Sequence, residues 1–515
     1  MTQWSPNWNL NGKAPVVAPS VEMNVSACQD FPVAVIDIGS NSVRVVIFDG
    51  LNRVPRVLFN EKVLCGLGRG LTKTHQLHPE GREQALVTLA RFEALWRGIG
   101  VVKVLAVATA AVRDAKDGIA FCREAETVIG QSVQILSGEE EGIFSALGVI
   151  SGMPNIDGVI GDLGGGSLEF ARVNNGQVRE VMSLPLGPQR IPNPDDTHDT
   201  RNLEYINEHL HRLPWRGELA GLPLIAVGGA WRSIARLHMH WESYPLHFIQ
   251  GYTLDNKAAL DISRVIALQS QKSVFQLGGV PKRRLSTLPT SALVLKRVIS
   301  EYIPSSVIFS AYGLREGLIF DRLVKAERAL DPLIYTAHKL GESVQRQSGF
   351  GQALALWSAP ILGSNNPEVE RLRQTGCELA DLAWYQHPDY RGFHARDVLL
   401  RTPFAGVTHH DRAFLAVALW TRYGGRLDHH GIGSLVDLIG PVRAKDAMTL
   451  GLVMRLGVNI SGGSTRVLKD TGLRKEGIDL VLDLSSHPEW YGEAVERRMA
   501  AVADAFGGIK FRVMH

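Results

Sequence analysis

The chain has 515 residues, which is long enough for three or four domains with a substantial buried core. Apolar residues make up 45% of it and charged residues 21%, a composition typical of globular proteins that gives no reason to expect extensive disorder. The formal net charge of +3 is too small to identify a polyanionic partner, so such a partner would need a local concentration of basic residues.

The four cysteines are scattered and form no CxxC pair, which argues against a disulfide framework and against a zinc site. A reducing, cytoplasmic setting fits this pattern. Residues 1–31 lack the basic and apolar segments of a secretory signal, and we expect them to form a flexible extension. No run of about 18 apolar residues occurs, so we expect no membrane span. We also expect no nucleic-acid partner.

The first folded segment, 32–157, has the alternation of strands and helices typical of an α/β domain. We expect strands at 33–39, 42–50, 57–64, 103–109 and 133–136, and helices at 79–96 and 114–129. Pro79 is well placed to open the first helix.

The same order of elements begins again at Gly158 and defines a second segment, 158–327. We expect strands at 158–164, 167–173, 178–184, 224–229 and 306–313, with helices at 202–211, from Ala230 through 302, and at 314–323. Four residues of the first segment have counterparts at a constant offset in the second: Asp37, Gly39, Ser42 and Arg44 fall opposite Asp162, Gly164, Ser167 and Glu169. This correspondence indicates a duplicated fold.

Beyond residue 327 the strand signals fade, and 328–515 is expected to be a mainly helical region. Helical periodicity occurs in ELADLAW, RAFLAVALWTRYGG and AMTLGLVMRL, and a final strand pair is expected near 478–484 and 509–514. Histidines gather at His387, His394, His409, His410, His429 and His430. A metal site is one interpretation of this group, and a helix cap by Asp411 is the other.

The two glycine-containing turns of the duplicated fold have the composition of phosphate-binding loops. The first turn has Gly39 followed by the candidate phosphate-binding residues Ser40, Asn41 and Ser42, and the second has Gly164, Gly165, Gly166 and Ser167. Glycine lets successive backbone N–H groups approach a phosphate without a Cβ clash. Asp37 and Asp162 precede the turns, and a carboxylate beside a phosphate implies an intervening hard cation such as Mg²⁺. The alternative is that both turns are ordinary tight hairpins.

Glu169 and Arg44 occupy equivalent places on the outgoing strands of the two hairpins. Glu169 would share the metal with Asp162 or orient its waters, and the alternative is a solvated strand residue. Arg44 would place a guanidinium on the opposite side of the phosphate.

An acidic segment, SGEEE, lies where a short strand ends and a helix begins. Ser137 and Glu140 have capping-box spacing, which accounts for Glu140. Glu141 is not needed for the cap, so it is either a base that activates water or a helix-terminal charge.

Three further residues end predicted strands. Arg113 follows VLAVATAAV directly, where open α/β sheets present ligand-binding groups; the alternative is a pair with a nearby aspartate. Gly228 and Gly229 form a strand-to-helix turn that could admit a nucleotide or polyphosphate.

Six motifs in order, VAVIDIGSNSVRVVIFDG, ATAAVRDAKDG, ILSGEEEGI, IGDLGGGSLEF, LPLG and YGLREG, resemble the exopolyphosphatase and guanosine pentaphosphate phosphohydrolase family over residues 33 to about 325. The resemblance implies a duplicated actin-like ATPase core, related to ribonuclease H, with the active site between its halves. It implies Glu141 as catalytic base, Asp162 and Glu169 as metal ligands, and Arg44, Arg113 and Arg315 as phosphate-binding residues. The C-terminal region resembles the helical extension of long members, similar to histidine–aspartate phosphohydrolases.

The expected function is therefore Mg²⁺-dependent removal of terminal phosphates from inorganic polyphosphate, by a cytoplasmic homodimer. The alternatives are hydrolysis of guanosine pentaphosphate, transfer of phosphate to ADP, or a non-catalytic actin-like binding protein. Basic segments in the helical region would extend the cleft into a track for a long chain.

Overall fold

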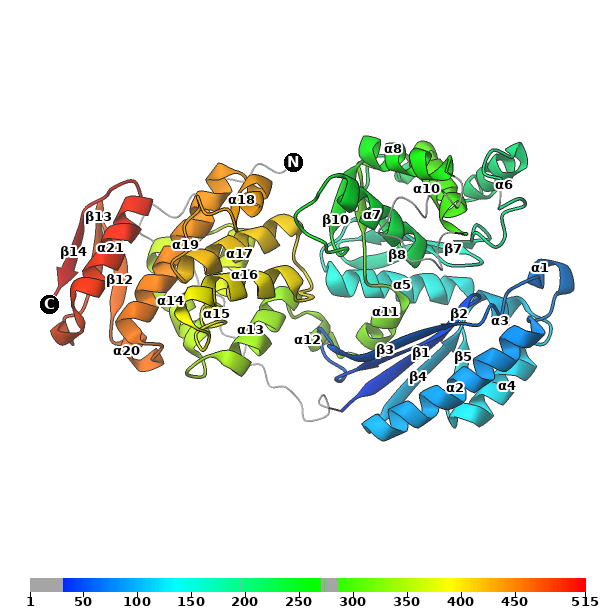
Figure 1. The fold of residues 1–515 in the computed structure, drawn as a ribbon, viewed down its shortest axis with the longest axis horizontal. Coiled ribbons are helices and arrows are strands. Elements are labelled where there is room, and N and C mark those ends of the chain that lie inside the picture. The colour runs from blue at the N-terminus through cyan, green and yellow to red at the C-terminus, as the bar shows by residue number, and fades with distance from the viewer. Residues whose placement is uncertain (1–30, 195, 270–272, 274–285) are drawn as a thin grey trace. The chain divides into compact units, whose positions relative to one another are not determined.

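The computed structural model describes residues 31–194, 196–269, 273 and 286–515 (Figure 1). Nearly all of the extension predicted at 1–31 lies outside these residues. The chain divides into two compact units between Leu330 and Asp331. No helix in the described ranges is long and apolar enough to cross a membrane.

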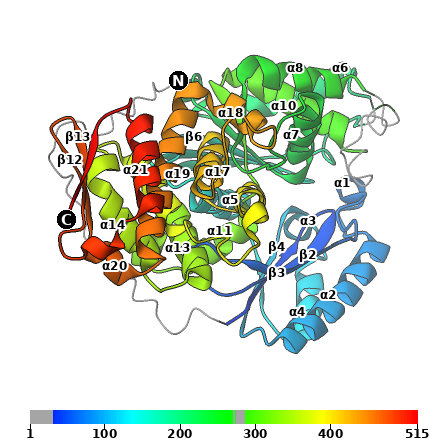
Figure 2. The same ribbon diagram turned by 60° about the vertical axis from the view of Figure 1, so that its left-hand side comes forward.

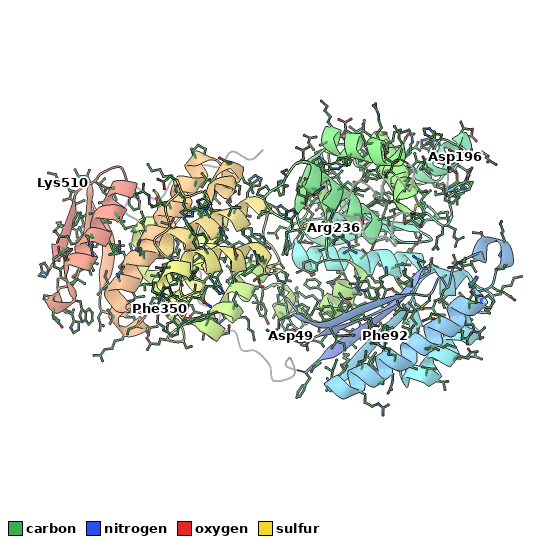
Figure 3. The ribbon with its side chains drawn as sticks, viewed as in Figure 1. Asp49, Phe92, Asp196, Arg236, Phe350 and Lys510 are labelled. Atoms are coloured by element: carbon green, nitrogen blue, oxygen red, sulfur yellow. The ribbon has the colours of Figure 1, made fainter. Side chains whose placement is uncertain are left out.

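The first sheet of the N-terminal unit has the order β3-β2-β1-β4-β5. Its strands are β1 (Val33–Ile38), β2 (Ser42–Phe48), β3 (Val57–Leu64), β4 (Lys103–Ala108) and β5 (Val133–Ile135). Strands β1 to β3 form antiparallel pairs, whereas β4 lies parallel to β1 and to β5. Figure 1 shows α2 (Pro79–Ile99) and α4 (Gly118–Ile129) along one face of this sheet. Phe92 of α2, labelled in Figure 3, is fully buried in the core between them.

The second sheet has the order β10-β11-β9-β6-β7-β8, and its last three strands repeat the hairpins of the first. The strands are β6 (Gly158–Leu163), β7 (Leu168–Asn174), β8 (Gln177–Leu184), β9 (Leu224–Val227), β10 (Tyr252–Asp255) and β11 (Ser306–Phe309). The associated helices are α6 (Thr200–Leu210), α7 (Gly229–Trp241), α8 (Asn256–Ala267) and α10 (Leu288–Tyr302). The predicted duplication is confirmed.

Two helices fill the layer between the sheets, α5 (Gly138–Gly152) and α11 (Leu314–Asp321) (Figure 1). Helix α5 contributes to the core of the second sheet, although it precedes that sheet in sequence, and α11 packs on the first sheet. They cross closely at Gly317, where an added Cβ would lie 1.7 Å from the carbonyl oxygen of Phe144. This crossing ties the two halves together.

Two local predictions for the N-terminal unit are wrong. The helix predicted at 114–129 begins only at Gly118, as α4; a short helix α3 (Ala110–Asp114) precedes it, and the two are separated by a turn in which the side chain of Asp117 accepts a hydrogen bond from the backbone N–H of Leu77. Arg113 therefore lies in a short helix and not at the end of a strand. The all-helical prediction from Ala230 through 302 missed β10, a four-residue edge strand too short to show periodicity. Part of that predicted range, 270–272 and 274–285, lies outside the described residues.

The C-terminal unit is mainly helical, as predicted (Figure 2). Its helices are α13 (Pro332–Val344), α14 (Phe350–Leu362), α15 (Pro367–Glu378), α16 (Arg391–Arg401), α17 (His409–Arg422), α18 (Gly433–Ile439), α19 (Pro441–Ser461), α20 (Thr465–Lys469) and α21 (Glu493–Ala505). The predicted strand pair is present as β13 (Asp479–Asp483) and β14 (Phe511–Met514), and β12 (Gly472–Glu476), which was missed, completes a three-stranded sheet.

The helix predicted over ELADLAW is wrong, since α15 ends at Glu378. The hydroxyl of Tyr423 donates to the carbonyl oxygen of Ala380 and accepts from the backbone N–H of Ala383. These contacts, from the residue that follows α17, satisfy backbone groups that a continuing helix would have satisfied itself.

Candidate active site

The two hairpin turns have the same geometry. In the first, Asp37 pairs with Arg44 across the β1–β2 ladder, and in the second Asp162 pairs with Glu169 across β6–β7. Each turn is closed by a backbone hydrogen bond of 3.0 Å, from Gly39 to Ser42 and from Gly164 to Ser167. The counterparts inferred from sequence spacing are therefore equivalent in structure.

The turns face each other across one cleft. An added Cβ at Gly166 would lie 3.5 Å from Oγ of Ser40, so the second turn is close to the first. The cleft brings together all but one of the site residues predicted from the sequence: Asp37, Ser40, Asn41, Ser42, Arg44, Glu141, Asp162, Gly164, Gly165, Gly166, Ser167, Glu169, Gly228, Gly229 and Arg315. Arg113 is the exception, and it contacts Glu141 from beside the cleft.

The glycines of the second turn are not required by the chain itself. None of the three from Gly164 to Gly166 has a positive φ, and a Cβ at each would meet only ordinary contacts of 3.4 Å or more. Gly228 differs, because its φ is 103° and an added Cβ would lie 2.4 Å from the carbonyl oxygen of Leu163. A ligand that approaches the backbone closely would explain the glycines that the fold does not.

Glu141 lies in the first turn of α5 and reaches the cleft. Ser137 and Glu140 form the predicted capping box at the start of this helix, which leaves Glu141 outside the cap. Burial and the neighbouring carboxylate of Glu169 raise the pKa of Glu141 well above its usual value, against a smaller lowering by Arg113. A carboxylate with a raised pKa is a better proton acceptor near neutral pH.

Asp162 and Glu169 are buried beside Glu141. Asp162 accepts a hydrogen bond of 2.5 Å from Ser145, and Glu169 accepts one of 2.9 Å from Ser183. Burial, with repulsion from Asp37, raises the pKa of Asp162. Burial, with repulsion from Asp162, raises the pKa of Glu169 to about 7. Neighbouring anions that hinder one another's ionisation suit a cation.

No three His, Cys, Asp or Glu side chains converge into a metal cage within the ranges that the structure describes. A pair of carboxylates nevertheless fits Mg²⁺, which keeps several waters and is commonly held by one or two carboxylates plus substrate phosphates.

In the C-terminal unit, Asp411 forms a capping box with Thr408 at the start of α17. A helix cap by Asp411 was the alternative to a metal site in the histidine-rich region.

Arginines supply positive charge opposite these acids. Arg315, at the start of α11, donates to Oδ2 of Asp37 over 3.2 Å, while its buried Nε has no hydrogen-bond partner among the described residues. Arg44 donates to Asn60, its neighbour on β3, over 2.9 Å. An unpartnered buried donor beside a cleft is suited to an incoming acceptor.

Sequence reasoning missed a second set of residues lining the cleft: Lys62, Thr109, Gln189, Arg232, Thr287 and Ser291. Arg232 is the most informative of them. It follows Gly229 by three positions in α7, one helical turn from the glycine pair, and this spacing was the available signal. Burial, with repulsion from Arg315, lowers the pKa of Arg232 to about 10.

Comparisons with known proteins agree with this geometry. Residues 28–326 match the Ppx/GppA phosphatase family, and residues 334–513 match the exopolyphosphatase C-terminal family. The chain is similar to retrograde regulation protein 2 of Saccharomyces cerevisiae, with 26% identity over 433 residues that cover 76% of this chain and 73% of the relative. It is likewise similar to exopolyphosphatase 1 of Mycobacterium tuberculosis, with 26% identity covering 56% of this chain and 87% of the relative.

Solved structures give the fold. The Ppx/GppA family member of Aquifex aeolicus is 24% identical and aligns with a TM-score of 0.50, covering 57% of this chain and 98% of its own. The exopolyphosphatase of Cytophaga hutchinsonii is 23% identical, with a TM-score of 0.52, over 57% of this chain and 99% of its own. The duplicated actin-like fold is confirmed.

Proposed function

The chain belongs to the Ppx/GppA phosphatase family, and we propose that it removes terminal phosphates from inorganic polyphosphate in the cleft between its two sheets. Family membership makes it a phosphoanhydride hydrolase, as the motifs predicted. The proposal adds the substrate, Mg²⁺ and Glu141 as the base. The proposal also includes a cytoplasmic location and a homodimeric state. Light scattering of the purified protein would test the dimer.

One observation carries the proposal: the glycines of the second turn line a cleft that also holds an acid outside its helix cap and a set of arginines. Backbone N–H groups of both turns would bind phosphate oxygens, and Arg44, Arg232 and Arg315 would balance their charge. A pure binder of polyanions would gain nothing from carboxylates at this place.

Glu141 would accept the proton of the attacking water. As the water oxygen bonds to the terminal phosphorus and the bridging oxygen leaves with the shortened chain, the water proton passes to the Glu141 carboxylate. Arg113 would hold that carboxylate in place through its contact of 3.4 Å with Oε2. Arg315 would donate to developing charge through its free Nε.

Asp162 and Glu169 would hold Mg²⁺. When bound, the ion would neutralise charge on the phosphate oxygens that it contacts. Ser145 and Ser183 keep the two carboxylates oriented through the hydrogen bonds described above. Asp37 accepts a hydrogen bond from Arg315 over 3.2 Å. It would therefore orient that arginine, or bind the waters of the ion and not the ion itself.

The lining of the cleft favours inorganic polyphosphate over guanosine pentaphosphate. No Phe, Tyr, Trp or His side chain lines it among the residues that the structure describes. Among these residues a guanine ring meets no aromatic partner, whereas a chain of phosphates meets Arg44, Lys62, Arg232 and Arg315.

The decisive experiment is release of phosphate from separate substrates. The protein with Mg²⁺ is incubated with long polyphosphate, tripolyphosphate or guanosine pentaphosphate, each with and without ADP. We expect release from polyphosphate that does not depend on ADP. Exclusive activity on guanosine pentaphosphate, formation of ATP from ADP, or no release from any substrate would each refute the proposal.

A further inference from the structure

The C-terminal unit contains an excess of arginine around a single acid. Two arginines contact Asp381, namely Arg346, which precedes α14, and Arg422 of α17. Three more belong to the same group: Arg391 of α16 and Arg455 of α19 lie near Arg422, and Arg498 of α21 lies near Arg455. These segments pack together within one unit, since α17 and α19, and α19 and α21, are neighbours. None of the five belongs to the cleft described above.

Asp381 neutralises only one of these charges. It is almost fully buried, and Arg346 engages both of its oxygens, with Nη2 2.6 Å from Oδ1 and Nε 3.0 Å from Oδ2. Arg422 reaches Oδ1 only at 3.5 Å. Two guanidinium groups thus share one carboxylate, which leaves a net positive charge.

Arg422 is buried and incompletely satisfied. Its side chain is 8% exposed, and its Nε has no hydrogen-bond partner in the described part of the chain. The guanidinium lies over the ring of Tyr423, 4.4 Å from the ring centroid. Burial, with repulsion from Arg346 and Arg391, lowers the pKa of Arg422. A buried donor without an acceptor costs free energy that a bound anion would recover.

Arg455 extends the positive charge toward solvent. Within the described ranges it has no hydrogen bond and no ion pair, and burial together with Arg498 and Arg422 lowers its pKa to about 10. The guanidinium lies beside Gly424, where an added Cβ would be 2.8 Å from Nη2. Arg391 and Arg498 donate to the neutral acceptors Gln386 and Asn459, and neither pairs with an acid in the part of the chain that the structure describes.

We propose that Arg346, Arg422 and Arg455 form a binding site for a phosphate group in the C-terminal unit, separate from the hydrolytic cleft. Several guanidinium groups close together are suited to bind phosphate, because phosphate carries two negative charges and accepts hydrogen bonds in many directions. The phosphate group could be free orthophosphate or belong to a polyphosphate chain. The site stands on these contacts alone and does not depend on which substrate the cleft hydrolyses.

Hydrogen exchange on the full chain tests the site, because it reports the arginine site and the hydrolytic cleft through different peptides. The protein in EDTA receives orthophosphate in one arm and tripolyphosphate in the other. We expect slower exchange in peptides covering 419–425 and 452–458 in at least one arm, and the arm that acts at lower concentration identifies the source. In Arg455→Met this protection should need about tenfold more anion or more, while protection of peptides covering 160–170 is unchanged.

Arg497→Met is the matched control, because Arg497 lies next to Arg498 on α21 but is exposed and paired with Glu493. Arg497→Met should leave the protection of peptides covering 419–425 and 452–458, and that of peptides covering 160–170, as in wild type. Arg455→Met removes an unpaired, half-buried charge, so it should not lower the melting temperature in EDTA. Absence of protection at 419–425 and 452–458 in both arms would overturn the proposal. Equal protection in Arg455→Met and wild type would overturn it too.

Discussion

Arg113 donates from Nη1 to Oε2 of Glu141 over 3.4 Å and, from the same nitrogen, to the carbonyl oxygen of Leu136 over 3.1 Å. The second contact anchors the guanidinium to the end of β5, one residue before the cap of α5. Its charge opposes the burial and repulsion that raise the pKa of Glu141. The residue sets how readily the proposed base ionises, even though it does not line the cleft.

Glu141→Gln should reduce phosphate release by about 10² to 10⁴ while polyphosphate binding is kept or slightly tightened. The substitution removes the proton acceptor and a negative charge but preserves shape. Turnover is measured as phosphate release, and binding by competition with a labelled short polyphosphate. Glu140→Gln, which alters only the capping box, is the control. Near-normal turnover in Glu141→Gln would exclude it as the base.

The activity should have an acid limb set by Glu141. The carboxylate must be ionised to act, and its pKa is raised, so activity should fall as pH decreases through a value well above the usual range of glutamate. Arg113→Gln removes a cation that lowers this pKa, and the limb should move to higher pH. The readout is kcat against pH at saturating substrate. A limb that stays in place would show that another group controls it.

The sequence predicted which residues gather in the cleft better than it predicted the local elements around them. The alignment of Asp37 and Arg44 of the first half with Asp162 and Glu169 of the second was correct. Each half pairs its two residues across the same strand ladder, so a constant offset in sequence becomes the same geometry in structure. The break between α3 and α4 depends on Asp117, whose side chain is used by Leu77 forty positions away. Arg232 was missed although it lies one helical turn after Gly229, because this spacing alone does not show that α7 turns that face toward the cleft.

Glu169→Gln should separate stability from metal dependence. The folded-state pKa of Glu169, about 7, lies above the unfolded value of 4.5, so its contribution to stability is present below pH 4.5 and is lost as pH rises through 7. In EDTA at pH 8 the variant should be more stable than wild type by up to about 3 kcal/mol, with little difference at pH 4.5. Urea unfolding measures this difference.

The same variant, and Asp162→Asn, should need about tenfold more Mg²⁺ for half-maximal activity, because each loses an anionic oxygen from the proposed metal site. Glu139→Gln, in the first turn of α5, is the control for a nearby charge change. If the Mg²⁺ titration of both variants matched that of wild type, neither residue would belong to the metal site.

Arg315→Ala and Arg44→Ala should each weaken polyphosphate binding and flatten its salt dependence. Contacts between cations and a polyanion release counterions, so each lost contact should reduce the slope of log affinity against log salt by roughly one. Arg97→Ala, on the exposed end of α2, should leave the slope unchanged. A slope near zero in wild type would point to a small nucleotide substrate.

The second glycine turn gives the sharpest test of whether the hairpins bind phosphate or are simply tight turns. An alanine Cβ at 165 would lie 3.4 Å from Oε1 of Gln189 and 3.5 Å from Cβ of Ser40, which are ordinary contacts. Gly165→Ala should therefore leave the melting temperature within a few degrees of wild type. If a phosphate approaches the backbone there, the new methyl group should obstruct it and raise KM about tenfold or more.

Gly187→Ala is the matched comparison. Its Cβ would lie 2.4 Å from the backbone of Gly166 and Ser167, so the chain itself requires that glycine. This variant should lose about 1–3 kcal/mol of stability, because the backbone of the turn would have to move. Gly165→Ala with unchanged KM and unchanged melting temperature would show that the turn does not contact the substrate. Activity would then have to rest on Glu141 and the arginines without a phosphate-binding turn in the second half of the fold.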